Sequence, residues 1–76
     1  MDINFFIDQF ADQFDETDVS LFTPETNFKN LDEWSSLTAL SIIAMVDANF
    51  GVRINGDDIR SVNTINELFK IVSDKK

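Results

Sequence analysis

The sequence contains neither cysteine nor histidine. Without these side chains the protein has no disulfide, no thiolate nucleophile, no imidazole base and none of the usual zinc ligands. At 76 residues it is also too short to bury both a core and a deep catalytic cleft, because a domain of this size buries only about 60% of the surface that its unfolded chain exposes. We therefore expect a single domain over residues 1–76 that is not an enzyme.

Long apolar runs and a basic beginning are missing as well. No run approaches the ~18 apolar residues that a membrane span needs. The first residues, Met1-Asp2-Ile3-Asn4, lack the basic start of a signal peptide. A content of 43% hydrophobic and 26% charged residues is typical of a soluble globular chain. These features predict a cytoplasmic protein.

Positive charge is scarce, with six Lys and Arg against 14 Asp and Glu and a net charge of −8. Residues 1–35 hold nine acidic residues and a single cation, Lys29, so they carry the whole net charge. Residues 36–76 hold five residues of each sign. This balance argues against binding to nucleic acid or anionic membranes and is compatible with a basic protein partner.

Two clusters have ordinary structural interpretations. The acidic residues Asp12, Asp15, Glu16 and Asp18 lack the ligand spacing and turn glycine of an EF-hand, so we expect a solvated face and no metal site. The eight phenylalanines are expected to build the core, because a chain this short has few other groups for it.

The spacing of apolar residues predicts helices over residues 3–14, 36–50, 56–60 and 64–73. Asp2 is a plausible N-cap of the first helix, and Thr64 with Glu67 forms a capping box for the last. Residues 15–35 show no sustained period and are expected to form a long loop, a kind of segment that is usually functional. We expect its anchors to be apolar side chains, namely Val19, Leu21, Phe22, Phe28 and Leu31.

The helix expected over residues 36–50 has two apolar sides. One side carries Ala39, Ile42, Ile43, Val46 and Phe50, and the other carries Leu37, Leu40, Ala44 and Ala48. One of them must face the core. The second is either an ordinary half-exposed face or a surface for a partner.

Ser36 lies where the acidic loop gives way to this helix. A helix start presents free backbone N–H groups and the positive end of the dipole, so a phosphate ester on this hydroxyl would be electrostatically favoured. Alternatively, Ser35 or Ser36 merely caps the helix. Trp34, the only tryptophan, either shapes a partner contact beside Ser36 or pins the loop end onto the bundle.

In these features the chain resembles the acyl carrier proteins, small acidic four-helix domains that carry 4′-phosphopantetheine on a serine. In that family the serine belongs to an Asp-Ser-Leu motif at the start of the second helix, and Ser35-Ser36-Leu37 occupies the same place. The motif alone is not specific, but its combination with spacing and size is, and the similarity involves essentially the whole chain. Downstream it runs without a gap through Ala39, Leu40, Ile42, Ile43, Val46, Phe50-Gly51-Val52, Ile54, Ile59, Val62, Thr64, Ile65 and Ile71.

The resemblance implies an all-α, four-helix bundle with a long loop between the first two helices and a short third helix. It implies that Ser36 carries covalent 4′-phosphopantetheine, whose thiol holds acyl intermediates as thioesters in fatty-acid or specialised, polyketide-type biosynthesis. The implied partners of a monomeric carrier are a phosphopantetheinyl transferase and acyl-loading and acyl-transfer enzymes. Candidate partner-binding residues are Trp34, Leu37, Leu40, Ser41, Ala44 and Asp47, and candidates for lining an acyl pocket are Ile43, Val46, Ile54, Ile59 and Val62.

Three features depart from the family's pattern. Ser35 replaces the usual Asp, Asp32-Glu33-Trp34 occupies a segment that often contains Gly, and the second helix offers only Asp47 where the family is typically rich in Glu. We therefore expect specialised partners and contacts that depend more on apolar side chains than on charge. The alternatives are an aminoacyl or other short-chain carrier of a dedicated pathway, and an unmodified carrier-like interaction module.

Overall fold

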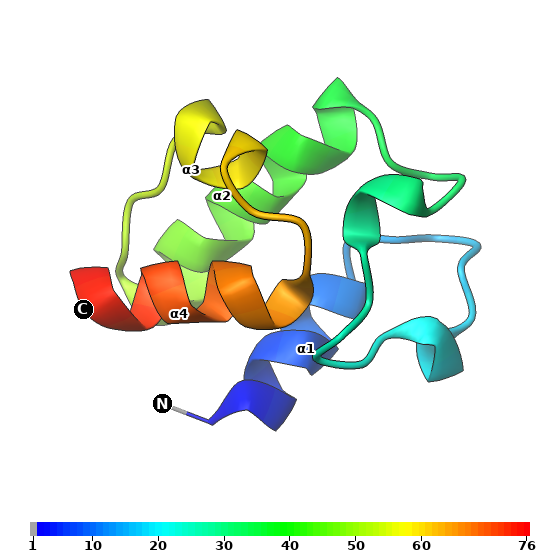
Figure 1. Cartoon of the computed structure of the whole chain (residues 1–76), viewed down its shortest axis with the longest axis horizontal. Helices are drawn as coiled ribbons and strands as arrows, with labels where there is room; N and C mark the ends of the chain where they lie inside the picture. The colour runs from blue at the N-terminus through cyan, green and yellow to red at the C-terminus, as the bar shows by residue number, and fades with distance from the viewer. Residues whose placement is uncertain (1) are drawn as a thin grey trace.

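A computed structural model describes residues 2–76 as an all-helical fold with extents of 29 × 24 × 20 Å (Figure 1). Its α-helices are α1 (Ile3–Ala11), α2 (Ser36–Phe50), α3 (Gly56–Arg60) and α4 (Ile65–Lys75). Two short 3₁₀ helices, η1 (Val19–Leu21) and η2 (Phe28–Asn30), lie in the connection between α1 and α2. Among the described residues there is no strand, only an isolated antiparallel bridge between Asn27 and Thr64. The expected all-α bundle is confirmed.

The helices surround one core. α1 packs against both α2 and α4, and α3 packs against α4. In Figure 1, α4 lies along the lower part of the molecule beside α1, α2 crosses above them, and the connection from α1 to α2 forms the right-hand side. The start of α2 is at the top of this view, away from both chain ends. No helix in residues 2–76 is long and apolar enough to cross a membrane.

The expected bounds of α2 and α3 are confirmed, and those of α4 nearly so, because Thr64 is its N-cap and the helix runs two residues further than expected. The expected end of the first helix at residue 14 is wrong. α1 ends at Ala11, since the backbone N–H groups of Gln13 and Phe14 donate to the carbonyls of Phe10 and Ala11, three residues back, at 3.1 and 3.0 Å. These bonds tighten the chain into a turn that still buries Phe14.

The core is built around the ring of Phe10, which is fully buried. Four further phenylalanine rings have centroids 5.4 to 6.3 Å from it, those of Phe6, Phe14, Phe22 and Phe28. The expectation that phenylalanines build the core is thus confirmed for most of them. Phe5 is an exception, because 45% of it is exposed.

Two of the five expected loop anchors are wrong. Phe22 and Phe28 are buried and Leu31 packs against the core, but Val19 and Leu21 are 71% and 55% exposed. The ring of Phe22, at the end of η1, takes the core position beside Phe14, with the ring centroids 5.0 Å apart. The single turn of η1 leaves its own apolar side chains outside.

The same connection is fastened to the start of α4. The backbone N–H groups of Ile65 and Asn66 donate to the carbonyls of Thr26 and Pro24 at 3.2 and 2.9 Å. These N–H groups belong to the first turn of α4, where they have no partner inside the helix. The loop therefore satisfies a helix end and is held in place by it.

Candidate functional site

The two serines at the start of α2 have different surroundings. Ser35 has an extended backbone and is the N-cap, since its Oγ accepts a hydrogen bond from the backbone N–H of Thr38 at 3.3 Å. Ser36 is the first helical residue; it is exposed, and within residues 2–76 its hydroxyl makes no hydrogen bond. Of the two serines considered as caps, Ser35 is therefore the cap, and the Ser36 oxygen stays accessible.

The cap is continuous with the end of the loop. The Thr38 hydroxyl donates to the carbonyl of Glu33 at 2.7 Å, and its oxygen lies 3.2 Å from that of Ser35. The residues on either side of Ser36 are thus tied together across the helix start. This arrangement holds Ser36 in a fixed place without using its side chain.

The two-sided character of α2 is confirmed. Ile42, Val46 and Phe50 are buried on one side, whereas Leu37 and Leu40 on the other are 77% and 60% exposed. The exposed leucines lie one and four residues after Ser36. The other proposed partner-binding residues of α2, which are Ser41, Ala44 and Asp47, are exposed too.

Trp34 is half-buried and pins the loop end onto the core, which is one of the two roles that the sequence suggested for it. Its ring packs edge-on against Phe28, with centroids 4.8 Å apart. Part of its surface also lines a groove that reaches Ser36. The residue next to the cap is therefore anchored on one side and accessible on the other.

We call this depression the Ser36 groove. It has a volume of about 480 Å³ and is formed by η2, the start of α2 and α3, with a lining of Lys29, Trp34, Ser35, Ser36, Ala39, Gly56, Ile59 and Arg60. Lys29 and Arg60 give the groove two cations, and neither was among the site residues predicted from the sequence. The available signal was that Lys29 is the only cation in residues 1–35.

The residues suggested for an acyl pocket belong to the apolar interior. Val46, Ile54, Ile59 and Val62 are buried in the core, and Ile43 packs against it partly buried. Ile59 also lines the Ser36 groove. The groove and the apolar interior are thus contiguous at this residue.

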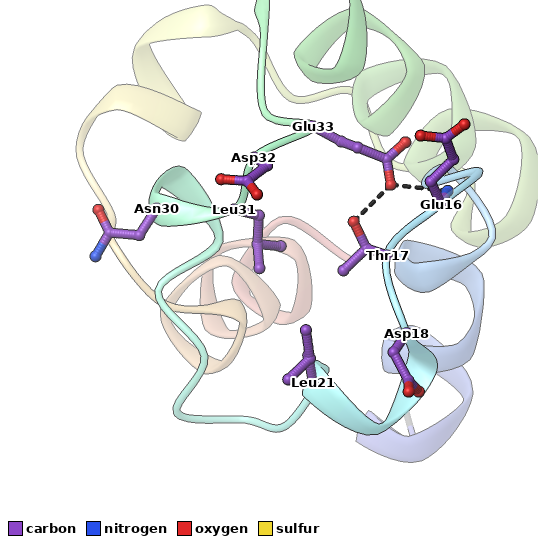
Figure 2. A pocket seen from close by; sticks show the side chains of 8 residues that line it. All are labelled: Glu16, Thr17, Asp18, Leu21, Asn30, Leu31, Asp32 and Glu33. Carbon is purple, nitrogen blue, oxygen red and sulfur yellow. Dashed lines mark hydrogen bonds between the residues drawn. The ribbon is translucent and has the colours of Figure 1, made fainter.

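On the other side of the loop end, Glu33 fastens the loop to the residues that follow α1. Its carboxylate accepts hydrogen bonds from the backbone N–H groups of Asp15 and Glu16, at 3.1 and 2.8 Å, and from the Thr17 hydroxyl at 2.5 Å. Figure 2 shows this side chain reaching toward Glu16 and Thr17. It lies in a second groove of about 430 Å³, which is lined by Glu16, Thr17, Asp18, Leu21, Asn30, Leu31, Asp32 and Glu33.

These hydrogen bonds lower the pKa of Glu33. The Thr17 hydroxyl is the largest cause; partial burial opposes it, and the N–H groups of Glu16 and Asp15 act in the same direction as the hydroxyl. Although acidic side chains gather here, no group of three or more within residues 2–76 could hold a metal ion. In the second groove, the end of the loop thus contacts the residues that follow α1.

We expect Glu33→Gln to lower the melting temperature at neutral pH and to remove part of its pH dependence. A carboxyl whose pKa is lowered by folding stabilises the fold above its unfolded value, and this stability is lost as the pH falls through the folded value. The difference in Tm between the wild type and Glu33→Gln should therefore shrink as the pH falls below the ordinary pKa of 4.5. Thermal melts between pH 7 and pH 3 measure it.

Glu25→Gln is the matched control, because it removes the same charge from an exposed residue of the same loop. In a chain of net charge −8, any such removal also relieves repulsion. Equal melting of the two variants throughout the pH range would show that the Glu33 contacts do not stabilise the loop.

Comparison with protein-family models matches residues 4–72 to the phosphopantetheine attachment site. Neither a curated protein nor a solved structure matches the chain. The matched segment begins in α1 and ends in α4, so it includes the start of α2 and both grooves. Proteins with this domain are loaded by a phosphopantetheinyl transferase and act together with partner enzymes. The chain therefore belongs to the phosphopantetheine attachment family and is a carrier of covalent 4′-phosphopantetheine, in agreement with its resemblance to acyl carrier proteins.

Proposed function

We propose that Ser36 is the attachment residue and that the protein is an acyl carrier. The observation that carries the proposal is that Ser35 caps α2 while the adjacent Ser36 hydroxyl is exposed and makes no hydrogen bond within residues 2–76. When bound, 4′-phosphopantetheine supplies a thiol that holds an acyl group as a thioester. The chain itself contributes the attachment oxygen and the surface on which partners recognise it.

The surroundings of Ser36 fit a phosphodiester. The first turn of α2 contains no acidic residue, and its backbone N–H groups have few partners inside the helix. The positive end of the helix dipole favours a negative charge at this place. Lys29 and Arg60 add positive charge in the groove that Ser36 lines.

The proposal is tested by incubating the purified protein with coenzyme A and a phosphopantetheinyl transferase. Intact mass should show a single adduct, and peptide mapping should place it on Ser36. A protein that gains no adduct under conditions that load another carrier would support the unmodified interaction module. An adduct on Ser35 would refute the assignment of the residue while leaving the carrier function in place.

We further propose that partner enzymes contact the exposed face of α2 and Trp34. Leu37 and Leu40 form the apolar part of this surface, and Asp47 is the only charged residue of α2. Ser41 and Ala44 complete the exposed face. A single carboxylate gives a basic partner few ion pairs to form, so apolar contacts would dominate recognition. This favours specialised rather than general partners.

Replacing Leu37 or Leu40 by Ser is expected to lower kcat/KM for loading by the phosphopantetheinyl transferase about 5- to 30-fold in each variant. Burying the exposed part of each side chain contributes about 1–2 kcal/mol to a complex. Because both leucines are largely exposed in the free protein, the melting temperature should change little. Leu21→Ser, on η1, is the matched control and should load at the wild-type rate. Equal rates for all variants would show that α2 is not the contact surface.

The proposal extends to the cargo and the place where it is held. An acyl chain would lie among Ile43, Val46, Ile54, Ile59 and Val62, entering beside Ile59, where the Ser36 groove meets the apolar core.

The pathway would be fatty-acid or specialised polyketide-type biosynthesis. The unusual Trp34-Ser35 pair and the nearly uncharged α2 favour a dedicated pathway, in which an aminoacyl or short acyl cargo is the alternative. The protein would act as a non-catalytic, monomeric, single-domain carrier in the cytoplasm.

A further inference from the structure

The two cations of the Ser36 groove come from distant parts of the sequence and are connected to each other. The Lys29 ammonium donates to the backbone carbonyl of Arg60 at 3.0 Å, which joins η2 to the end of α3. Lys29 is half-buried and lines the groove. The single cation of residues 1–35 is thus held in the groove that Ser36 also lines.

The side chain of Arg60 is also placed by its neighbours. It forms an ion pair with Asp57, one turn earlier in α3. It lies over Gly56, where an added Cβ would come within 3.2 Å of Nη1. The missing side chain at position 56 therefore leaves room for the guanidinium along the groove.

We propose that the Ser36 groove is a resting site for the phosphopantetheine arm, an inference that depends on attachment at Ser36. Lys29 and Arg60 hold the phosphodiester, while Trp34, Ala39 and Ile59 provide an apolar wall for the atoms that follow it. A phosphodiester on Ser36 would be attached to a residue that lines the groove, together with Lys29 and Arg60. A volume of about 480 Å³ is within the usual range of small-molecule sites.

The hold on the arm is weak and suited to release. Arg60 is exposed, and Asp57 competes with the phosphodiester for its guanidinium. Contacts between exposed charges contribute little in water and are screened by salt. Each cation should raise the ratio of resting to free arms about 2- to 5-fold. A partner enzyme that binds α2 can then withdraw the arm at little cost.

The test uses protein loaded by a phosphopantetheinyl transferase, with Lys29→Gln, Arg60→Gln and the control Arg53→Gln. Arg53 is an exposed cation outside the groove. The ³¹P chemical shift of the phosphodiester reports its surroundings, and the same protein in urea gives the value for a free arm. In the wild type the resonance should differ from that reference. It should move toward the reference in Lys29→Gln, in Arg60→Gln and in high salt, but not in Arg53→Gln.

Two further variants separate a lost charge from a disturbed fold, and a fluorescence measurement tests the groove independently of the phosphorus resonance. Lys29→Arg keeps the charge and should retain the wild-type resonance, whereas Asp57→Asn frees Arg60 and should move the resonance further from the reference. Fluorescence of Trp34, the only tryptophan, should change when the apo protein is loaded. A single ³¹P shift for all the loaded variants, with no change in fluorescence, would overturn the resting site alone. An adduct on Ser35 would overturn both the resting site and the assignment of Ser36, and absence of any adduct would overturn the carrier function as well.

Discussion

Ser36→Ala is expected to abolish loading with 4′-phosphopantetheine while leaving the fold intact. The change removes the only oxygen that the proposed attachment can use, and the neighbouring Ser35 oxygen is engaged at the helix cap. Stability should stay within about 0.5 kcal/mol of the wild type, because Ser36 is exposed and alanine is a good helix former. Intact mass after incubation with coenzyme A and a transferase measures loading, and a thermal melt measures the fold.

Ser35→Ala is the matched variant, with the opposite expected result. Loss of an N-cap costs about 1 kcal/mol, which lowers Tm by about 4–8 °C in a domain of this size. The Ser36 hydroxyl is still present, so the adduct should still form below the melting temperature. Ser35→Asp keeps a capping side chain and restores the residue that the family usually has there, and it should load as well. An adduct on Ser36→Ala, or none on folded Ser35→Ala, would contradict our assignment.

The bounds of α2 and α3 could be predicted because their ends are determined by local chemistry. Ser35 and Asn55 are good N-caps, and each accepts a hydrogen bond from the backbone of its own helix. Gly51 follows α2 with a φ of 67°, a left-handed conformation that glycine adopts without strain. Signals of this kind lie within a few residues of the boundary that they determine.

The end of α1 and the orientation of η1 could not be predicted in this way. Apolar spacing continues to Phe14, and nothing in the sequence distinguishes a last helical turn from a tighter turn that buries the same ring. Val19 and Leu21 are apolar like Phe22, but in the assembled core it is the ring of Phe22 that packs against Phe10 and Phe14. These choices depend on the assembled core, so they follow from tertiary packing.

The position of Ser36 at the start of α2 and the exposed face of α2 could be predicted from the sequence. The two cations of the Ser36 groove could not. Lys29 and Arg60 lie 31 residues apart and meet through a side chain and a backbone carbonyl. No local pattern encodes such a contact. The unequal distribution of charge nevertheless singled out Lys29, and a lone cation in an acidic segment is a reasonable place to look for an anion.

The largest loss of stability is expected for Phe10→Ala, about 3–5 kcal/mol, because the ring is fully buried among four others. A chain of 76 residues has a total stability of about 4–11 kcal/mol, so a large part of it would be removed. Urea denaturation measures the loss, and Phe5→Ala, at a half-exposed ring, should cost much less. Equal losses would mean that Phe10 is not the centre of the core. Function should fall with stability, because Phe10 contacts Phe28 and Phe28 supports Trp34, two residues before the proposed attachment serine. Partial unfolding of Phe10→Ala should therefore slow loading, and conditions that restore its folded fraction should restore the rate.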